Sequence, residues 1–191
     1  MNSNFEQIIL GSSSIYRAGL LKKYIPNFEI KSPDIDESPR KKESAKELSL
    51  RLAISKARKI SISEPNALVI GSDQVASFNG NILGKPKSYK EAYKTIMAFS
   101  NGEVIFYTGV SIIHKNKCLE ESYIDVTRVI FNNFTNEMLT EYLDSEETLN
   151  TTAGVKMESH LFQKLVNEIQ TQDPEAIIGL PIQWLLKKLI S

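Results

Sequence analysis

A short serine-rich segment near the start of the sequence has the composition of an anion-binding loop. The run Gly11-Ser12-Ser13-Ser14 follows an apolar stretch and precedes a helical pattern that contains Arg17. Small residues at a helix N-terminus leave backbone N–H groups free to meet an anion at the positive end of the helix dipole. The guanidinium of Arg17 adds a bidentate donor nearby. The segment therefore predicts either a phosphate site or a serine-rich helix cap beside a surface arginine.

Lys56 is a cation on the apolar side of a predicted helix. At about 100° per residue, the apolar side chains of residues 43–60 form one broad face, and Lys56 projects near its middle. A lysine in that place either extends its charged end past the apolar surface to water or directs it into a phosphate site. The pattern leaves both readings open, but it predicts that Lys56 points inward.

Two acidic segments could act beside such cations. Asp73 comes just after the apolar run at residues 67–70, which we expect to be a buried strand. Ligands of open α/β sheets usually bind beyond the carboxyl ends of strands, where a carboxylate can hold a divalent cation or orient water. The alternative interpretation is that Asp73 is a turn residue that caps local amides. The run Asp34-Ile35-Asp36-Glu37 lies in an expected loop and supplies either a second metal-side carboxylate or solvated charges.

Several familiar signatures are excluded. The segment Gly80-Asn81-Ile82-Leu83-Gly84-Lys85-Pro86 looks like a phosphate loop, but it has three residues between its glycines rather than four, and Pro86 stands where Ser or Thr would hold magnesium. Taken alone, Lys85 is interpreted as a charged residue of a surface loop. The sequences H-E-x-x-H, C-x-x-C and G-x-S-x-G do not occur. We expect His114 and His160 to be ordinary surface or edge residues.

The composition narrows the class of protein. The chain has 191 residues, 23 basic and 23 acidic side chains, 41% hydrophobic residues and a single cysteine. We expect one domain over residues 1–191 with a substantial core. Balanced charge argues against nucleic-acid binding, and the lone Cys118 excludes a disulfide framework within the chain and favours the cytoplasm. Residues 1–10 lack a basic region, so we expect no signal peptide, and residues 104–113 are too short to span a membrane.

Hydrophobic periodicity and capping residues predict strands and helices in mixed order. Strands are expected at residues 5–10, 67–70, 104–114, 119–134 and 161–169, the third and fourth as an antiparallel pair. Helices are expected from the serine loop to about residue 24, at 43–60, from the capping box of Ser88 and Glu91, at 136–143 and after Pro181. This order predicts a mixed α/β domain in which helices flank a long, partly antiparallel sheet.

These segments also have the order and spacing of a known family. The chain resembles the Maf family of nucleoside triphosphate pyrophosphatases along nearly its whole length. The matching motifs are Ser12-x-Ser14-x-x-Arg17, Asp36-Glu37, Lys56-Ala57, Gly71-Ser72-Asp73-Gln74, Gly84-Lys85-Pro86, Thr108-Gly109, Ala153-Gly154 and Gly179-Leu180-Pro181. The resemblance implies a fold related to inosine triphosphate pyrophosphatases, with two lobes around a cleft, and a homodimer. It also implies hydrolysis of a nucleoside triphosphate to monophosphate and pyrophosphate with a divalent metal, Mg²⁺ or Mn²⁺.

The resemblance implies a role for each matching side chain. Asp73 takes the place of the proton acceptor, and the carboxylates of Asp73 and Glu37 are expected to bind the metal. The residues expected at the substrate phosphates are Ser12, Ser14, Arg17, Lys56 and Lys85. Cations and the metal would offset the phosphate charge and stabilise the charge that develops during the reaction. Asp73 would orient or deprotonate the attacking water.

Tyr16, Gln74 and Glu158 stand where the family reads the base. The branch similar to pyrimidine-preferring dTTP/UTP pyrophosphatases usually has Arg, Thr and Gln there, whereas the 7-methyl-GTP branch has an aromatic residue, Gln and Glu. We therefore expect 7-methyl-GTP, whose cationic ring would stack on Tyr16 and whose N1–H and amino group would donate to Glu158. Counted without gaps, Ser159 takes the last position instead. The alternative interpretation is that Tyr16 packs within its helix and that Glu158 is a charged residue of a surface loop.

Two other functions stay open. One is a pyrophosphatase that acts on dTTP, UTP or another noncanonical nucleotide, and the other is a nucleotide-binding regulator of cell division whose catalytic step is incidental. The loop also departs from the family's pattern, because Ile15 replaces the usual proline and Ala18 stands where the 7-methyl-GTP branch often has a second arginine.

Overall fold

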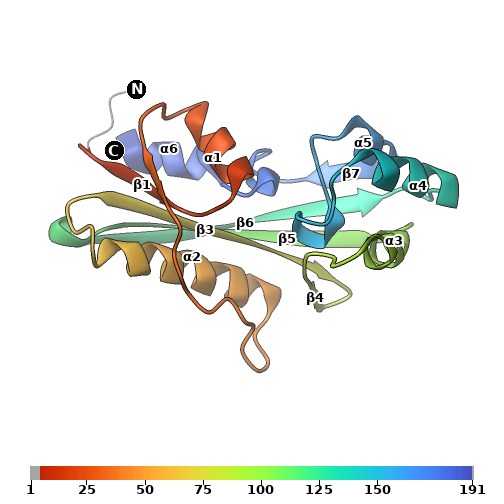
Figure 1. Cartoon of the computed structure of the whole chain (residues 1–191), viewed down its shortest axis with the longest axis horizontal. Coiled ribbons are helices and arrows are strands. Elements are labelled where there is room, and N and C mark those ends of the chain that lie inside the picture. The colour runs from red at the N-terminus through yellow and green to blue at the C-terminus, as the bar shows by residue number, and fades with distance from the viewer. Residues whose placement is uncertain (1–4, 191) are drawn as a thin grey trace. The chain divides into compact units, whose positions relative to one another are not determined.

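The computed structural model describes residues 5–190 and contains one seven-stranded sheet with helices (Figure 1). Residues 1–4, part of the segment expected to lack a signal peptide, and residue 191 lie outside that range. The strands are β1 Ile8–Gly11, β2 Glu29–Lys31, β3 Leu68–Phe78, β4 Asn81–Leu83, β5 Glu103–His114, β6 Leu119–Phe131 and β7 Val166–Gln170. The helices are α1 Ile15–Lys22, α2 Ala45–Ser61, α3 Tyr89–Met97, α4 Asn136–Ser145, α5 His160–Leu165 and α6 Ile182–Ile190. The mixed α/β class predicted from the sequence is confirmed.

The sheet is partly parallel and partly antiparallel. Its order is β2-β1-β3-β5-β6-β7, and β4 pairs with β3. β1 is parallel to both β2 and β3, whereas β4 is antiparallel to β3 and β7 is antiparallel to β6. β5 and β6 are neighbours joined only by a short turn, and a connection of that length joins antiparallel strands, as predicted.

The chain divides into two compact units. The first comprises Met1–Gln74, Tyr107–Asp125 and Asp173–Ser191, and the second comprises Val75–Phe106 and Val126–Gln172. The long strands β3, β5 and β6 contribute residues to both units. No helix among residues 5–190 is long and apolar enough to cross a membrane.

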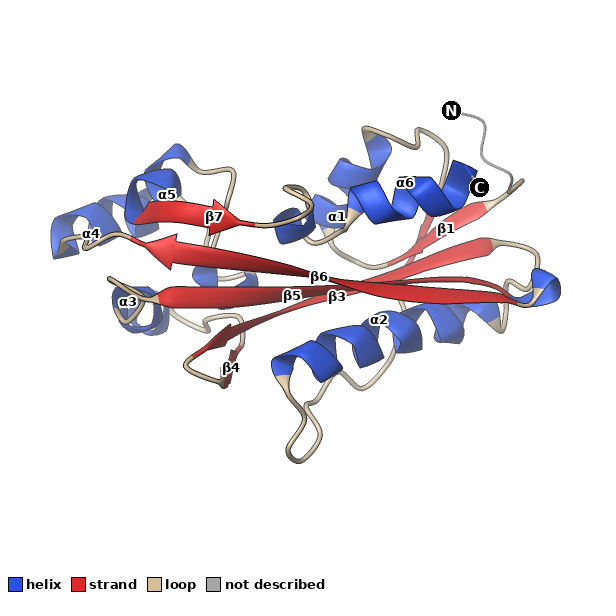
Figure 2. Ribbon diagram, turned by 180° about the vertical axis from the view of Figure 1, so that it is seen from behind, coloured by secondary structure: helices blue, strands red, loops and turns tan. Residues whose placement is uncertain are grey.

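In the first unit, helices cover both faces of the strands (Figure 2). Alternate residues of a strand point to opposite faces. The even-numbered Leu68 and Ile70 of β3 therefore join the cluster that includes residues of α1 and α6. The odd-numbered Val69 lies instead in the cluster that contains Ala57 and Ile60 of α2. Any later residue of β3 can be assigned to one of these two faces by the same alternation.

β3 is longer than predicted, and this corrects the expected position of Asp73. The apolar run ends at Ile70, but the strand continues to Phe78 and turns through Asn79-Gly80 into β4. Both turn residues have positive φ, 49° and 77°, as a tight hairpin requires. Asp73 thus lies inside a strand, and the turn role is wrong. Its register position is still close to the end of β1, because Gly11 of β1 pairs with Gly71.

The second unit is built round an aromatic core that also explains a wrong prediction. Residues 161–169 form helix α5 followed by strand β7, not one strand. Ser159 caps α5 by accepting a hydrogen bond from the N–H of Phe162, whose ring lies 5.8 Å from that of Phe131 and 5.4 Å from that of Tyr142. The cap and these ring contacts favour a helical turn before the chain pairs with β6.

The two histidines differ from each other. His160 is exposed, as predicted. His114 at the end of β5 is only 5% exposed, so its prediction as a surface or edge residue is wrong. Its Nδ1 accepts the N–H of Lys117 and thereby closes the turn to β6.

Candidate functional site

Helix α2 lies unusually close to the strands beneath it. A Cβ atom on Gly71 would come within 2.2 Å of the Ala53 carbonyl oxygen, and one on Gly109 within 2.5 Å of the Ser49 carbonyl oxygen. Glycine at these two positions therefore lets the helix backbone rest on β3 and β5. The contacting residues of the helix, Ala53 and Ala57, are small and fully buried. This packing fixes the distance between the side chains of α2 and those of β3.

Lys56 of α2 meets two carboxylates. Its Nζ lies 2.6 Å from Oδ1 of Asp73 and 2.8 Å from Oε1 of Glu37. The side chains of Lys56 and Asp73 are 7% and 11% exposed, whereas that of Glu37 is 55% exposed. The inward orientation predicted for Lys56 is confirmed, and its charged end reaches carboxylates rather than open water.

The serine loop and Arg17 form a second cationic group in the same unit. Ser14 is the N-cap of α1 and accepts the N–H of Arg17. Ser12, which is 3% exposed, accepts the N–H of Ser14 and lies 3.4 Å from Nη1 of Arg17. Nε of Arg17 donates to the carbonyl oxygen of Gly179 at 2.9 Å. Burial lowers the pKa of the Arg17 guanidinium, and the nearby Asp73 and Glu37 act in the opposite direction.

Ser72 and Gln74 face the side of the strand opposite Asp73. The hydroxyl of Ser72 lies 2.8 Å from each of the carbonyl oxygens of Gly109 and Gly179. The amide nitrogen of Gln74 donates to backbone carbonyls of the 3₁₀ turn Ala176–Ile178, at 2.8 Å to Ile177 and 3.2 Å to Ala176. These bonds fasten that turn to β3. The amide nitrogen of Gln74 is thus engaged in holding this turn.

Arg51 is a charged residue of this unit that the sequence did not single out. Its guanidinium forms a bidentate pair with Glu43, at 2.5 Å and 2.9 Å. The hydrogen bond to Glu43 raises the pKa of Arg51, and burial acts against it. The same bond lowers the pKa of Glu43 to about 2. Glu43 precedes α2, and no helical spacing rule connects it to Arg51, so the sequence carried no signal for the pair.

Lys85 lies in the second unit, in the exposed loop that follows β4. The loop is held from both sides of this residue. The N–H of Ala153 donates to the carbonyl oxygen of Gly84 at 3.1 Å, and Pro86 is buried. The side chain of Lys85 therefore stands on an anchored backbone.

Glu158 and Ser159, also in the second unit, differ in availability. Glu158 is exposed, whereas Ser159 is 4% exposed and caps α5. The Ser159 hydroxyl also bonds to Glu146, whose pKa is lowered first by Lys156 and then by this serine. Of the two residues that the sequence left open, Glu158 has the free carboxylate.

The structure thus brings together Ser12, Arg17, Lys56, Asp73 and Glu37 within the first unit. Ser14 and Tyr16 lie at the start of α1, and Gln74 lies on the opposite face of β3 from Asp73. Among the described residues, no group of three or more metal-ligating side chains occurs. Two carboxylate oxygens, those of Asp73 and Glu37, nevertheless converge on one cation, the ammonium of Lys56.

Comparisons with known proteins find relatives along nearly the whole chain. The chain is 36% identical over 184 residues to a Nitrosospira multiformis protein named 7-methyl-GTP pyrophosphatase, covering 96% of this chain and 92% of that protein. A Nitrosococcus oceani protein of the same name is 39% identical over 182 residues, covering 95% and 91%. The solved Ham1 protein of Staphylococcus aureus has a TM-score of 0.48 and 16% identity over 67% of this chain and 73% of that one, which is too low a likeness to add to the assignment. A sequence profile described as Maf-like protein matches residues 7–191, and the chain therefore belongs to the Maf family.

Proposed function

We propose that this protein hydrolyses 7-methyl-GTP to 7-methyl-GMP and pyrophosphate, and so removes a modified nucleotide from the pool. Family membership and the names of two relatives at 36% and 39% identity support the reaction class and the substrate. The observation that carries the proposal is the convergence of a buried lysine and two carboxylates, with Lys56 Nζ at 2.6 Å and 2.8 Å from Asp73 and Glu37. A cluster of charged side chains in which a lysine and a carboxylate are buried together is typical of a catalytic site.

The cations would bind the triphosphate. Arg17 can donate a planar pair of N–H groups to phosphate oxygens, and Lys56 can act as a point charge beside them. Ser12 and Ser14 add hydroxyls at the N-terminus of α1, where the helix dipole favours an anion. Lys85, on its anchored loop in the second unit, is proposed as the third cation. Together these groups would stabilise the charge that accumulates on the leaving pyrophosphate.

Asp73 would activate the water. Its carboxylate accepts a proton as the water oxygen forms a bond to phosphorus, and the bond between the α and β phosphates breaks with its electron pair leaving on pyrophosphate. Lys56 holds Oδ1 of Asp73 at 2.6 Å and so orients the carboxylate in the strand. Water attack thus requires a carboxylate that is held in place, and the contact of Asp73 with Lys56 does this.

The residues present fit a divalent cation. Mg²⁺ is usually bound by one or two carboxylates together with substrate phosphates and water. Asp73 and Glu37 offer such a pair, because their oxygens already meet at one cation. When bound, Mg²⁺ or Mn²⁺ would polarise the phosphate and offset its charge. We propose these two residues as its protein ligands.

Tyr16 and Glu158 are proposed to select the base. Methylation at N7 makes the guanine ring cationic, which favours stacking on an aromatic face such as Tyr16. The exposed carboxylate of Glu158 can accept from the N1–H and the amino group of guanine. Gln74 would contribute through its Oε1, since its nitrogen is held by backbone carbonyls. A cytoplasmic location, which the single cysteine supports, and a homodimer belong to the same proposal.

A nucleotide panel tests this function. Purified protein is incubated with 7-methyl-GTP, GTP, dTTP and UTP in Mg²⁺ or Mn²⁺, and monophosphate and pyrophosphate are measured. We expect the highest kcat/KM for 7-methyl-GTP and a loss of about 10³-fold or more in Asp73→Asn, since general-base catalysis contributes roughly 10²–10⁴-fold. Asp34→Asn, an exposed carboxylate of the loop before Glu37, is the matched control. The absence of both products with every nucleotide would end the proposal, and a preference for dTTP or UTP would reassign the substrate.

A further inference from the structure

Glu37 lies on a long connection that has no helix or strand of its own. Residues 32–44 join β2 to α2, and we refer to them as the Glu37 loop. The side chain of Glu37 is 55% exposed and forms an ion pair with Lys56. An ion pair whose carboxylate is more than half exposed contributes little to stability and cannot by itself order a loop of this length. Some other contact must hold the loop against α2.

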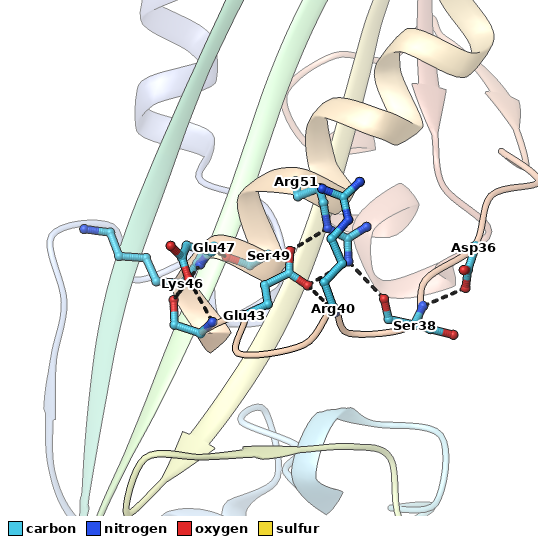
Figure 3. A network of polar contacts seen from close by, with 9 residues as sticks. Asp36, Ser38, Arg40, Glu43, Lys46, Glu47, Ser49 and Arg51 are labelled. Carbon is cyan, nitrogen blue, oxygen red and sulfur yellow. Dashed lines mark hydrogen bonds and ion pairs between the residues drawn. The ribbon is translucent and has the colours of Figure 1, made fainter.

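Arg51 supplies that contact (Figure 3). Its Nη2 donates to the carbonyl oxygen of Ser38 at 3.0 Å, next to Glu37 in the chain. The same guanidinium binds Glu43 at the far end of the loop through Nε and Nη2. The side chains of Arg51 and Glu43 are 17% and 8% exposed, so this pair is shielded from water in a way that the Lys56–Glu37 pair is not.

The rest of the loop is tied to these two points. Glu43 also accepts the N–H of Arg40 at 2.8 Å, and Asp36 accepts the N–H of Ser38 at 2.9 Å (Figure 3). The start of α2 is itself fixed by the capping box of Ser44. A continuous series of hydrogen bonds therefore runs from the helix through Arg51 to the residues on either side of Glu37.

We propose that Arg51 is a positioning residue that holds Glu37 at Lys56 and Asp73. The effect of this role on catalysis rests on the proposed function. The inference deepens that function by adding a residue that touches neither substrate nor metal. A planar guanidinium can donate to a carboxylate through two nitrogens and, at the same time, donate to a carbonyl oxygen. The ammonium group of lysine has a single nitrogen, so lysine should not replace Arg51. We call the hydrogen bonds of Arg51 to Glu43 and Ser38 the fork. Loss of the fork would free the Glu37 loop and weaken the divalent-cation site, while the contact of Lys56 with Asp73 stays in place.

The first test measures loop order without any turnover. Arg40, Lys41 and Lys42 are exposed within the Glu37 loop and are sites for trypsin. Limited digestion followed by mass spectrometry should show cleavage after these residues at least about tenfold faster in Arg51→Met and Arg51→Lys than in wild type, because nicking follows the population of the open loop. Arg58→Met is the matched control, since Arg58 lies on the same helix and pairs with Glu120 on an exposed surface.

The second test measures the metal. Binding of Mn²⁺ to the nucleotide-free protein, and the Mn²⁺ concentration for half-maximal hydrolysis, should both weaken about 10-fold or more in Arg51→Met, a typical loss for a residue that orients a ligand. At saturating Mn²⁺, kcat should stay within about threefold of wild type. In a Glu37→Gln background the Arg51→Met change should add nothing, because both act through one carboxylate.

The outcomes separate this proposal from the proposed function. Cleavage of the Glu37 loop at the rate of the Arg58→Met control, unchanged Mn²⁺ binding, or additive effects with Glu37→Gln would each overturn the role of Arg51. A wild-type protein that hydrolyses no nucleotide would refute the proposed function, yet the digestion would still decide whether Arg51 anchors the loop. If Arg51→Met does not fold, Glu43→Gln tests the same fork while leaving Arg51 in place.

Discussion

The close approach of α2 to β3 at Gly71 makes a strong prediction about this glycine. Gly71→Ala places a methyl group where the Ala53 carbonyl oxygen would be 2.2 Å away and the Ala57 nitrogen 2.6 Å away. Both atoms belong to the helix backbone, so no side chain can rotate to make room. The helix itself must move away from β3.

The size of this movement sets the expected effects. Ordinary van der Waals contact for a Cβ begins at 3.4 Å, so α2 must retreat by more than about 1 Å. Overpacking of a core costs typically 1–3 kcal/mol and more where the backbone is obstructed, and we expect a loss of at least about 3 kcal/mol in the free energy of unfolding. Because Lys56 moves with the helix, its contact with Asp73 at 2.6 Å should lengthen. A 1 Å misplacement costs roughly 10²-fold in rate.

Urea denaturation followed by circular dichroism measures the first effect, and 7-methyl-GTP hydrolysis under native conditions measures the second. Gly19→Ala in α1 is the matched control, because a Cβ there meets no atom within 4 Å. In that helix the same substitution should stabilise the protein by about 0.5–1 kcal/mol. A Gly71→Ala protein as stable as wild type would refute the close-packing argument. Undiminished hydrolysis in a destabilised variant would refute its link to Lys56.

Three further results are expected in denaturation experiments. Lys56→Met should cost about 3 kcal/mol because it leaves a buried carboxylate unpaired, and adding Asp73→Asn should recover most of that loss; additive losses would contradict the pairing. Gln74→Glu, which sets an acceptor against two backbone carbonyls, should cost about 2 kcal/mol, and wild-type stability would argue against the bonds to the 3₁₀ turn. The pKa of Glu43 lies at about 2 in the folded protein against an ordinary 4.5, so its contribution is complete above pH 4.5 and is lost as the pH falls through 2. Glu43→Gln should therefore be about 2 kcal/mol less stable at pH 7, and this difference should shrink steadily as the pH falls from 4.5 through 2; a pH-independent difference would exclude the charged pair with Arg51.

The sequence predicted those features that depend on local periodicity or on capping. The helical wheel located Lys56 on the buried side of α2, and the structure confirms its burial at 5% exposure. Ser88 was expected to begin a helix, and its side chain accepts the N–H of Glu91, the third residue after it. These signals are carried by neighbours within one or two helical turns, which is why a single sequence discloses them.

Features that depend on tertiary contacts were not accessible in the same way. The strand containing Asp73 was ended too early, because the apolar run stops at Ile70 while pairing with β4 carries β3 on to Phe78. Asp73 and Gln74 were read as one motif, yet strand alternation directs them to opposite faces. The pair of Arg51 with Glu43 needs the loop before α2 to fold back onto the helix, a geometry that no spacing of residues specifies.

The motifs that identify the family mix residues of two kinds, and the structure explains why they occur together. Asp73 and Lys56 carry charges, but their contact at 2.6 Å exists only because α2 rests on the strands at Gly71 and Gly109. The stem of Lys56 has a limited reach, so a helix seated further away would weaken its contact with the carboxylate. The glycines thus act on the chemistry through distance alone. A sequence that kept both charges and replaced these glycines would retain the composition of the site and lose its geometry.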